Sequence, residues 1–549
     1  MSFVGPGRPW RELPTLGDLL VRVVAEHPGS AAGMVTPDGR ATWAQVLTGA
    51  ERVAEGLLAL GLGPGARIAL VGDNSVEGVQ ALFACAFIGA VPVLVNTRYA
   101  VPEVRHVLAD AAVDAVLVTG HHDLARLVRD TLPGLAAAAD PAALRLAEVP
   151  SLRVAAAIGF AGGGFAAVDS RPGPDPAATA RRIGRLREQV TLRQTALMVY
   201  TSGTTARARG CPLSHEAVVG VSVGVGRDRF RCTAADVLWD VLPLFHLSFV
   251  LPLLAVLDAG GTFVTDRRFD AVRSLAQIRD EAVTIAFSCF PTVINALLDQ
   301  PTFGDAFARV RLMLNVGPPE TLRSIQARAP GTVQLTSYGC SEVGGIGATT
   351  GPDDSDEIRL GTNGFPLPGL QMAAIDPLTQ AVLPPGEPGE VVVRGIGLFE
   401  GYWHDPGKTA ASMTPDGWFR TGDLGFVDAA GRVSYRGRLK ETIKVGGENV
   451  APMEIEAVLG THPAVGTVAV VGVADPRLTE VPAAFVELRP GAVVSADELL
   501  AHCRSALADF KVPRHVRFVT QWPMSATKIR KDELARGLAA ELEVPPDPR

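Results

Sequence analysis

The residues best suited to bind phosphate lie between positions 199 and 215, in the stretch VYTSGTTARARGCPLSH. Hydroxyl and backbone N–H groups can surround a phosphate, and arginine side chains add the positive charge that its oxygens prefer. The candidate residues are Thr201, Ser202, Gly203, Thr204, Thr205, Arg207 and Arg209. The stretch is not a Walker A loop, because Cys211 follows Gly210 where that motif has a lysine. Taken alone, it fits a phosphate loop or a polar turn between a strand and a helix.

Five further motifs carry residues that suit nucleotide chemistry, and they follow the loop in order along the chain. They are PLFH at 243–246, YGCSE at 338–342, TGD at 421–423, GRLKETIKVGGENVAPMEIE at 437–456 and PMSATKIRK at 523–531. Attack of a carboxylate on the α-phosphate of ATP brings two anions together. A site for this reaction therefore needs cations, a metal ion and well-placed donors.

Together the six motifs resemble those of the adenylate-forming superfamily, which includes acyl- and aryl-CoA synthetases, firefly luciferase and the adenylation domains of peptide synthetases. The resemblance runs from about residue 16 to about residue 534. It implies an α/β fold, with a large N-terminal domain of αβ sheet layers, a β-rich subdomain and a small mobile C-terminal α/β domain. It also implies an ATP-dependent, AMP-forming ligase that makes an acyl adenylate and transfers the acyl group to CoA.

The resemblance assigns nucleotide roles to residues of the N-terminal part. Thr204 and Glu342 would help to hold Mg²⁺ between the phosphates of ATP. Tyr338 would stack on adenine, Asp423 would accept both ribose hydroxyls, and Arg438 would contact the ribose. The other nucleotide contacts that the resemblance implies are Thr201, Ser202, Gly203, Thr205, Arg209, Gly317, Gly339 and Ser341.

The resemblance also assigns chemistry to two lysines of the C-terminal part. Lys528 resembles the catalytic lysine that bridges the carboxylate and the α-phosphate; without the other motifs it would be read as a surface lysine. Lys440 stands at the family's hinge, which divides the chain into residues 1–439, with the β-rich part at about 361–439, and residues 440–549. Rotation of the C-terminal part at this hinge would move Lys528 away from the reacting groups. A second face of the same part, which serves thioester formation, would take its place. That face carries Lys444, Gly446 and Gly447.

His246 bears on which acid the enzyme activates. Peptide-synthetase domains usually have an aspartate at this position, which pairs with the α-ammonium group of an amino acid. A histidine flanked by Phe245 and Phe249 favours a carboxylic acid without an α-amine, although a core histidine is the structural alternative. By resemblance, His246 gates or lines the carboxylate pocket. Further wall residues expected from the neighbouring motifs are Phe287, Phe290, Val316 and Gly339.

Several positions depart from the family pattern, in which the loop reads Thr-Ser-Gly-Thr-Thr-Gly-x-Pro-Lys-Gly. Ala206, Ala208 and Arg209 replace the later Gly, Pro and Lys. If the glycine adopts a positive φ, alanine costs on the order of 1 kcal/mol, which bends the loop without abolishing binding. Thr527 replaces the glycine before the catalytic lysine, and 316–319 reads VGPP instead of GGAP.

Composition excludes several classes of protein. The chain has 549 residues, 47% of them hydrophobic and 20% charged, as in soluble proteins of two or more domains. A net charge of −7 disfavours a general nucleic-acid binder. We expect no signal peptide and no membrane span, and hence a cytoplasmic protein. Six cysteines without a Cys-x-x-Cys pair predict reduced thiols. The sequence carries no signal for an oligomeric state.

Apolar periodicity predicts alternating helices and strands. LGDLLVRVVAEH and WAQVLTGAERVAEGLLALG indicate helices, while RIALVG and VPVLVN indicate buried strands, as in βα units around a parallel sheet. Residues 123–182 are rich in Ala, Pro and Gly and are expected to form an irregular surface connection. From residue 361 short strands follow, and beyond residue 440 a smaller α/β unit begins.

Two other hypotheses stay open. An adenylating enzyme could use a different acceptor, a carrier protein or an amine, or adenylate an unusual oxyanion such as nitrite. A non-catalytic nucleotide-binding homologue would explain the altered loop, but the retained lysines argue against it. Formation of AMP and pyrophosphate separates the enzymes from the non-catalytic protein, and the mass of the product separates the acceptors.

Overall fold

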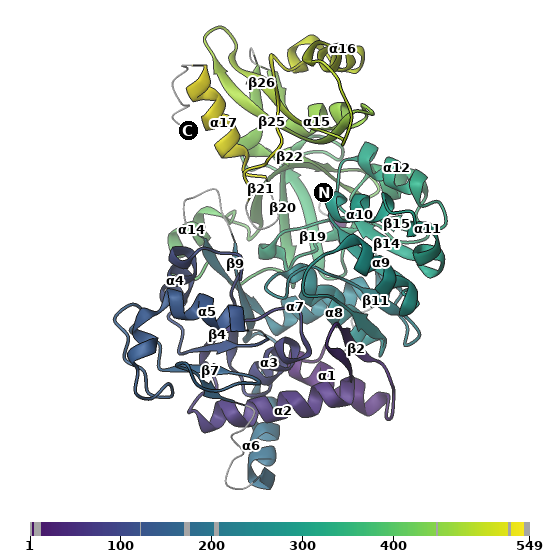
Figure 1. Ribbon diagram of the computed structural model, residues 1–549. Helices are drawn as coiled ribbons and strands as arrows, with labels where there is room; N and C mark the ends of the chain where they lie inside the picture. Colours follow the sequence, from purple (N-terminus) through teal and green to yellow (C-terminus); the bar gives the residue numbers. More distant parts are fainter. Residues whose placement is uncertain are drawn as a thin grey trace.

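The computed structural model describes residues 3–4, 13–120, 122–168, 176–201, 208–445, 448–524 and 529–542. Two seven-stranded sheets form the large N-terminal part, and a five-stranded sheet joins it to a smaller C-terminal unit with a sheet of its own (Figure 1). The mixed α/β fold expected from the sequence is confirmed. Among the described residues, no helix is both long and apolar enough to cross a bilayer.

The first sheet has the order β10-β9-β5-β4-β6-β7-β8. Its strands are β4 (Arg67–Val71), β5 (Val91–Leu94), β6 (Ala115–Val118), β7 (Val154–Ala157), β8 (Ala166–Ala167), β9 (Thr195–Thr201) and β10 (Arg209–Ser214). All neighbours pair in parallel except β9 and β10, which are antiparallel. The parallel strands are buried almost throughout, which explains their unbroken apolar runs.

The second sheet has the order β15-β14-β13-β11-β12-β2-β3. Its strands are β2 (Gly33–Thr36), β3 (Gly39–Thr42), β11 (Val237–Trp239), β12 (Thr262–Val264), β13 (Ile285–Cys289), β14 (Leu312–Asn315) and β15 (Val333–Leu335). In this sheet, neighbouring strands pair in parallel except β2 and β3, which form an antiparallel hairpin.

The helices of the N-terminal part cover these sheets and lie between them. They are α1 (Leu16–Glu26), α2 (Trp43–Ala59), α3 (Val76–Phe87), α4 (Val101–Asp110), α5 (His122–Thr131), α6 (Pro176–Gln189), α7 (His215–Gly224), α8 (Leu247–Asp258), α9 (Ala271–Asp280), α10 (Pro291–Leu298), α11 (Phe303–Ala306), α12 (Pro319–Arg328) and α13 (Asp356–Gly361). Helices α7 and α8 are apolar on all sides and sit between the two sheets in Figure 1, where they join one continuous core.

Local signals fix where these helices begin. Thr42 caps α2: its hydroxyl accepts the Gln45 N–H at 3.2 Å, and the Gln45 side chain accepts the Thr42 N–H at 2.8 Å. This reciprocal pair satisfies two of the N–H groups that a helix start leaves without intrahelical partners.

Short strands dominate the region from about residue 337 to residue 438. A three-stranded sheet contains β16 (Ser337–Tyr338), β17 (Ala348–Thr349) and β18 (Phe365–Pro366). A five-stranded antiparallel sheet has the order β1-β19-β20-β21-β22, from β1 (Phe3–Val4), β19 (Leu370–Ile375), β20 (Gly389–Gly395), β21 (Phe419–Val427) and β22 (Val433–Arg438). The short helix α14 (Pro406–Ala411) lies between β20 and β21 in sequence.

The C-terminal unit stacks above this sheet in Figure 1. Its strands are β23 (Ile443–Val445), β24 (Glu448–Val450), β25 (Val465–Asp475), β26 (Thr479–Leu488) and β27 (His515–Phe518), and its helices are α15 (Pro452–Gly460), α16 (Ala496–Ala506) and α17 (Lys531–Glu541). The unit has its own apolar core, centred on β25, β26, α15 and α16.

One expectation about local structure was wrong, and one strand was missed. Residues 123–182 are not an irregular surface connection, since they contain most of α5, the fully buried strand β7 and the start of α6. The alanine-rich run VAAA pairs in parallel with β6 and forms part of the sheet interior. The sequence also did not predict β10, which lies within the 199–215 stretch and returns antiparallel to β9 before α7 begins at His215.

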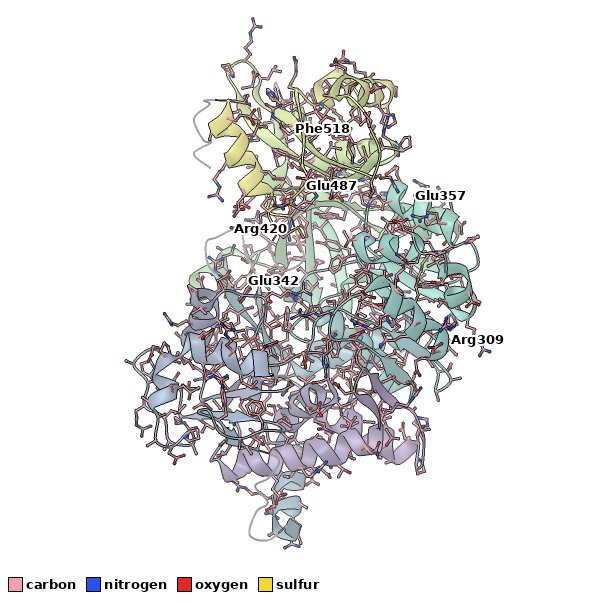
Figure 2. The ribbon with its side chains drawn as sticks, viewed as in Figure 1. Arg309, Glu342, Glu357, Arg420, Glu487 and Phe518 are labelled. Atoms are coloured by element: carbon pink, nitrogen blue, oxygen red, sulfur yellow. The ribbon has the colours of Figure 1, made fainter. Side chains whose placement is uncertain are left out.

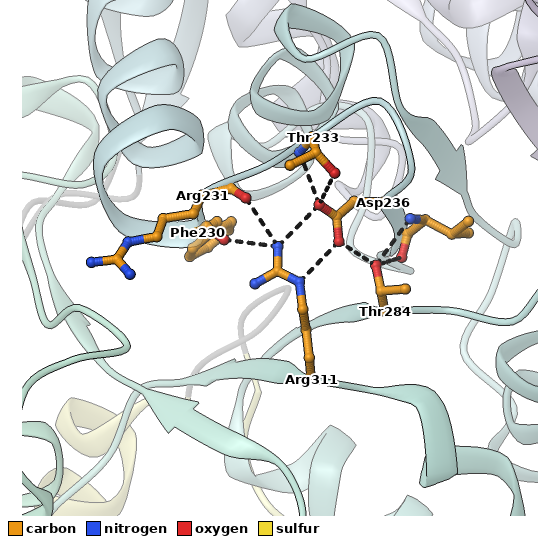
Figure 3. A network of polar contacts seen from close by, with 7 residues as sticks. Phe230, Arg231, Thr233, Asp236, Thr284 and Arg311 are labelled. Atoms are coloured by element: carbon orange, nitrogen blue, oxygen red, sulfur yellow. Dashed lines mark hydrogen bonds and ion pairs between the residues drawn. The ribbon is translucent and has the colours of Figure 1, made fainter.

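A buried polar network ties the second sheet to the end of a π-helical turn, residues 225–230 (Figure 3). The Asp236 carboxylate accepts hydrogen bonds from the Thr233 N–H at 2.8 Å, the Thr284 hydroxyl at 2.7 Å and Arg311 Nε at 2.9 Å. Arg311 Nη2 also donates to the Phe230 carbonyl at 2.9 Å. Burial alone would raise the pKa of Asp236, but these donors together lower it below its ordinary value.

Candidate active site

Three of the expected nucleotide residues form one cluster. Asp423 on β21 lies directly opposite Arg438 on β22, and Arg438 Nη1 is 2.9 Å from Asp423 Oδ1. Tyr338 of β16 donates its phenol to Asp423 Oδ2 at 2.7 Å. Asp423 and Tyr338 are buried, with exposed fractions of 3% and 7%. The strands therefore bring together a carboxylate, a guanidinium group and an aromatic ring from distant parts of the sequence.

The electrostatics of this cluster keep its groups in fixed protonation states. Burial, and next the charge of Asp423, raise the pKa of Tyr338 well above its ordinary value, so the phenol stays protonated and donates. Burial opposes the charge on Arg438, yet the Asp423 carboxylate raises the pKa of Arg438 overall.

A second carboxylate holds the turn that presents Asp423. Glu390 on β20 accepts the Gly422 N–H at 3.0 Å through Oε1, and its other oxygen binds Arg420 at 2.6 Å. Gly422 has a φ of 71°, in the left-handed region that glycine adopts most easily. The Thr421 hydroxyl donates to the Val391 carbonyl at 2.6 Å, which closes the turn on β20. Arg420 lies near the boundary with the C-terminal unit in Figure 2.

Glu342 lies in the middle of the molecule, on the turn after β16 (Figure 2). A short 3₁₀ helix, Ser341–Val343, carries it and ends at Gly344, whose φ is 73°. The Tyr402 phenol donates to Glu342 Oε1 at 2.9 Å, and the Phe399 N–H donates to the Glu342 carbonyl at the same distance. Gly339 just upstream leaves no room for a side chain, because a Cβ there would collide with the Gly345 carbonyl.

Glu342 fits the chemistry of a magnesium site shared with a nucleotide. Its carboxylate is half-buried, and the Tyr402 phenol engages one of its two oxygens. Mg²⁺ prefers oxygen ligands, and proteins often hold it with one or two carboxylates while substrate phosphates complete its shell. Among the described residues, no group of three or more His, Cys, Asp or Glu could form an all-protein metal cage.

The expected phosphate loop connects β9 and β10. Ser202, Gly203, Thr204 and Thr205, with Ala206 and Arg207, lie outside the described residues. The strands on either side are described: Thr201 ends β9 opposite Arg209, which begins β10. Arg209 Nε is 3.2 Å from Asp405 Oδ2, and His106 Nε2 is 2.9 Å from the Ala208 carbonyl. Both sides of the loop therefore leave the sheet at fixed points.

His246 precedes α8 and its ring packs against that of Phe245 at a tilt, with ring centroids 4.7 Å apart and planes inclined by 56°. Phe249 on the next turn is fully buried and packs edge-on against Phe263, so it belongs to the core and not to an exposed wall. Gly317 precedes α12, where an added Cβ would approach Pro291 at 3.3 Å.

The C-terminal residues are described in part. Lys444 is exposed on β23, and its N–H donates to Glu480 at 2.7 Å. Gly446, Gly447, Thr527 and Lys528 lie outside the described residues. Among the described residues that flank this segment, Met524 bridges to Ile529 and the Arg530 N–H donates to the Pro523 carbonyl at 2.7 Å.

Lys531, at the start of α17, forms ion pairs with two glutamates. Its ammonium group is 2.7 Å from Glu456 on α15 and 3.4 Å from Glu441 in the 3₁₀ turn that contains the expected hinge. Burial opposes its charge, but the two carboxylates raise the pKa of Lys531 overall. The segment that carries Lys528 is therefore tied to the chain next to Lys440.

Comparison with known protein families shows to which family this chain belongs. Residues 20–403 match the model of the AMP-binding enzyme family, and residues 454–528 match the model of the AMP-binding enzyme C-terminal domain. The chain belongs to the AMP-binding enzyme family. The expected adenylate-forming family and enzyme class, an AMP-forming ligase of the acyl-CoA synthetase type, are thereby confirmed.

Relatives of this AMP-binding enzyme span nearly its whole length. It is 33% identical to a feruloyl-CoA synthase of Amycolatopsis sp, over 95% of this chain and 98% of that protein. It is 32% identical to the 3-[(3aS,4S,7aS)-7a-methyl-1,5-dioxo-octahydro-1H-inden-4-yl]propanoyl:CoA ligase of Mycobacterium tuberculosis, over 95% and 98%. The crystal structure of the anthranilate CoA ligase AuaEII with anthranoyl-AMP has a TM-score of 0.83 and 26% identity, covering 97% of this chain and 99% of that one.

Some residues of this AMP-binding enzyme's site were missed from the sequence. Tyr402 and Asp405 contact expected site residues, and Glu390 contacts Gly422 next to the expected residue Asp423, yet each stands in an ordinary loop or strand pattern. The one signal that could have found Tyr402 is the pair of aromatic residues in EGYW, directly before a helix-capping aspartate. The domain boundaries and the roles of the individual site residues stay predictions.

Proposed function

We propose that the protein activates a carboxylic acid with MgATP as an acyl adenylate and then transfers the acyl group to CoA. One observation carries the proposal: the buried Asp423 carboxylate is bound by Tyr338 and Arg438, in a chain of the AMP-binding enzyme family. A rigid, buried carboxylate beside an aromatic ring suits recognition of a ribose diol and a base.

In the first half-reaction a carboxylate oxygen of the acid attacks the α-phosphorus of ATP, and pyrophosphate leaves. Asp423 accepts the two ribose hydroxyls, Arg438 supports it, and Tyr338 lies against the adenine. The hydroxyls and amides of the 201–205 segment and the charge of Arg209 bind the phosphates. Lys528 approaches the bridging oxygen, where negative charge develops.

Glu342, together with Thr204, would hold Mg²⁺ against the ATP phosphates, where the ion neutralises part of their charge. The fit rests on the Glu342 carboxylate, one oxygen of which is already oriented by Tyr402. The half-buried position of Glu342 leaves it within reach of a bound nucleotide.

In the second half-reaction the CoA thiolate attacks the acyl carbon, and AMP leaves with the former carboxylate oxygen. We place the hinge at Lys440, with residues 1–439 as the N-terminal core and 440–549 as the rotating unit. Rotation withdraws Lys528 and presents the β23–β24 face, on which Lys444 is exposed.

The substrate in this proposal is a carboxylic acid without an α-amine. His246 supports it, because a histidine packed against Phe245 provides no carboxylate to pair with an ammonium group. Because the relatives include a feruloyl-CoA synthase and an indenylpropanoyl-CoA ligase, ring-bearing acids are the first candidates to test.

A panel of aryl, ring-bearing aliphatic, medium-chain and long-chain acids, assayed for pyrophosphate release with and without CoA, tests the proposal. We expect release that depends on one group of acids, with AMP as the nucleotide product and an acyl-CoA when CoA is present. α-Amino acids serve as the negative control. Release of ADP would contradict the proposal. A product formed only with an amine or a carrier protein would show that this compound, and not CoA, is the acceptor.

A further inference from the structure

Residues 402–405, with the sequence YWHD, contact two distant parts of the site at once. We call this segment the 402–405 strap. Tyr402 reaches Glu342, which precedes it by 60 residues, while Asp405 reaches Arg209, which precedes it by 196 residues. Both partners flank the position where the proposed function puts the phosphates of ATP.

The first contact is a phenol-to-carboxylate hydrogen bond. The Tyr402 hydroxyl donates to Glu342 Oε1 at 2.9 Å, and the Tyr402 side chain is half-buried. Burial first, and then the charge of Glu342, raise the pKa of Tyr402. Its ring packs edge-on against Phe399 at 4.8 Å, and Phe399 packs in turn against Phe419 at 5.3 Å.

The second set of contacts joins the strap to the start of β10. The Trp403 N–H donates to the Gly210 carbonyl at 2.8 Å, and the Trp403 indole donates to the Asp110 carbonyl at 3.1 Å. Asp405 lies 3.2 Å from Arg209 through one oxygen, and its other oxygen caps α14 by accepting the Lys408 N–H at 2.9 Å. The strap is therefore held at both ends by hydrogen bonds that leave it little freedom.

We propose that Tyr402 is a positioning residue for Glu342, and that the 402–405 strap sets the place of the Glu342 carboxylate relative to the strand leaving the phosphate loop. This inference rests on the proposed function, because it concerns how Glu342 meets MgATP. A free glutamate side chain samples many rotamers, whereas a carboxylate with one oxygen held by a half-buried phenol presents the other in a more restricted direction. Hydrogen-bond partners of metal-binding carboxylates typically change metal affinity by 10- to 100-fold when they are removed.

Tyr402→Phe removes the hydroxyl and keeps the ring against Phe399. We expect the dissociation constant of ATP measured with Mg²⁺ to rise about tenfold by calorimetry, and that of ATP in EDTA to stay within about twofold of wild type. The Mg²⁺ concentration for half-maximal pyrophosphate release should rise in parallel. Tyr99→Phe is the matched control, since Tyr99 also lies beside a glutamate, Glu103, but on the loop before α4, and should change neither constant.

A double-mutant cycle tests the path through Glu342. If Tyr402 acts on the metal through this carboxylate, Tyr402→Phe should have no further effect on Mg²⁺ dependence in a Glu342→Gln background. Equal weakening of ATP binding with Mg²⁺ and with EDTA, together with a lower melting temperature, would show a merely structural role and overturn the inference.

The outcomes also separate this inference from the proposed function. A wild-type protein that binds ATP without regard to Mg²⁺ and releases no pyrophosphate with any acid overturns both. A wild-type protein that releases pyrophosphate, with a Tyr402→Phe variant of the same Mg²⁺ dependence, overturns only the positioning role of Tyr402.

Discussion

Tyr338 donates its phenol to Asp423 at 2.7 Å, across 85 residues of sequence and between two different sheets. The residue proposed to lie against adenine thus fixes the carboxylate proposed to accept the ribose. The same tyrosine stacks on Tyr435, with ring centroids 5.7 Å apart and planes inclined by 26°. In the proposed function, recognition of the base and of the ribose is therefore coupled through one side chain.

Removing this phenol should weaken ATP binding more than it slows chemistry. In Tyr338→Phe, the buried Asp423 loses one donor and keeps Arg438, a change of about 1–2 kcal/mol, which converts to a rise of roughly 5- to 30-fold in KM for ATP. We expect kcat to fall less than threefold, since the ring remains. Steady-state kinetics with saturating acid and CoA measure both constants, and an unchanged KM for ATP would contradict the coupling.

The charge of Arg209 should matter for ATP, while its ion pair with Asp405 should add little stability. Both side chains of the pair are partly exposed, at 25% and 38%, and such pairs contribute about 0–1 kcal/mol. We expect Arg209→Ala to raise KM for ATP about tenfold with a melting temperature close to that of wild type. Arg209→Lys, which restores the residue of the family pattern, should stay within about threefold of wild type. A large loss of stability in Arg209→Ala would assign the residue to folding instead.

The two lysines of the C-terminal unit should separate the half-reactions. Lys528→Ala should reduce acid-dependent pyrophosphate release by about 100-fold or more, because the variant loses the cation that meets the developing charge. Given a synthetic acyl adenylate, the same variant should still form acyl-CoA. Lys444→Ala should show the reverse pattern, with adenylation preserved and thioester formation slowed. Stopped-flow assays of each half-reaction measure this, and equal losses in both steps for either variant would count against domain rotation.

The Asp236 network should make stability depend on pH. Because its pKa is lowered in the folded protein, Asp236 contributes stability above its unfolded value of about 4, and that contribution is lost as the pH falls through the folded pKa. We expect Asp236→Asn to lower the free energy of unfolding by about 1–3 kcal/mol at pH 7, and by less near pH 3. Urea titrations at the two pH values provide the measurement. A difference that grows on acidification would have the wrong sign for this network.

The sequence predicted the elements whose buried residues follow a regular local pattern of apolar side chains. Strands β4, β5 and β9 and helices α1 and α2 correspond to apolar runs or amphipathic repeats. Strand β7 was missed because alanine-rich VAAA carries no β-branched side chain beyond one valine, and its place is set by pairing with β6. Strand β10 was missed because its composition, RGCPLS, resembles a loop.

The site was predictable where residues stand in motifs and not where contacts are made between them. Asp423 and Arg438 stand in motifs, and antiparallel pairing of β21 and β22 puts them opposite each other. No sequence motif identifies Tyr402, because its partner Glu342 is 60 residues away and the contact depends on how the turn after β16 packs against the 402–405 strap. Tertiary packing, which local periodicity does not encode, decided those positions.

Transfer of oxygen from the acid to AMP tests the central claim most directly. A carboxylic acid labelled with ¹⁸O in its carboxylate, incubated with the enzyme, MgATP and CoA, gives up one oxygen when the thiolate displaces AMP. We predict AMP that carries one ¹⁸O in its phosphate, seen by mass spectrometry, with unlabelled pyrophosphate and an equal amount of acyl-CoA. Unlabelled AMP, or label in inorganic phosphate released alongside ADP, would contradict an acyl-adenylate intermediate.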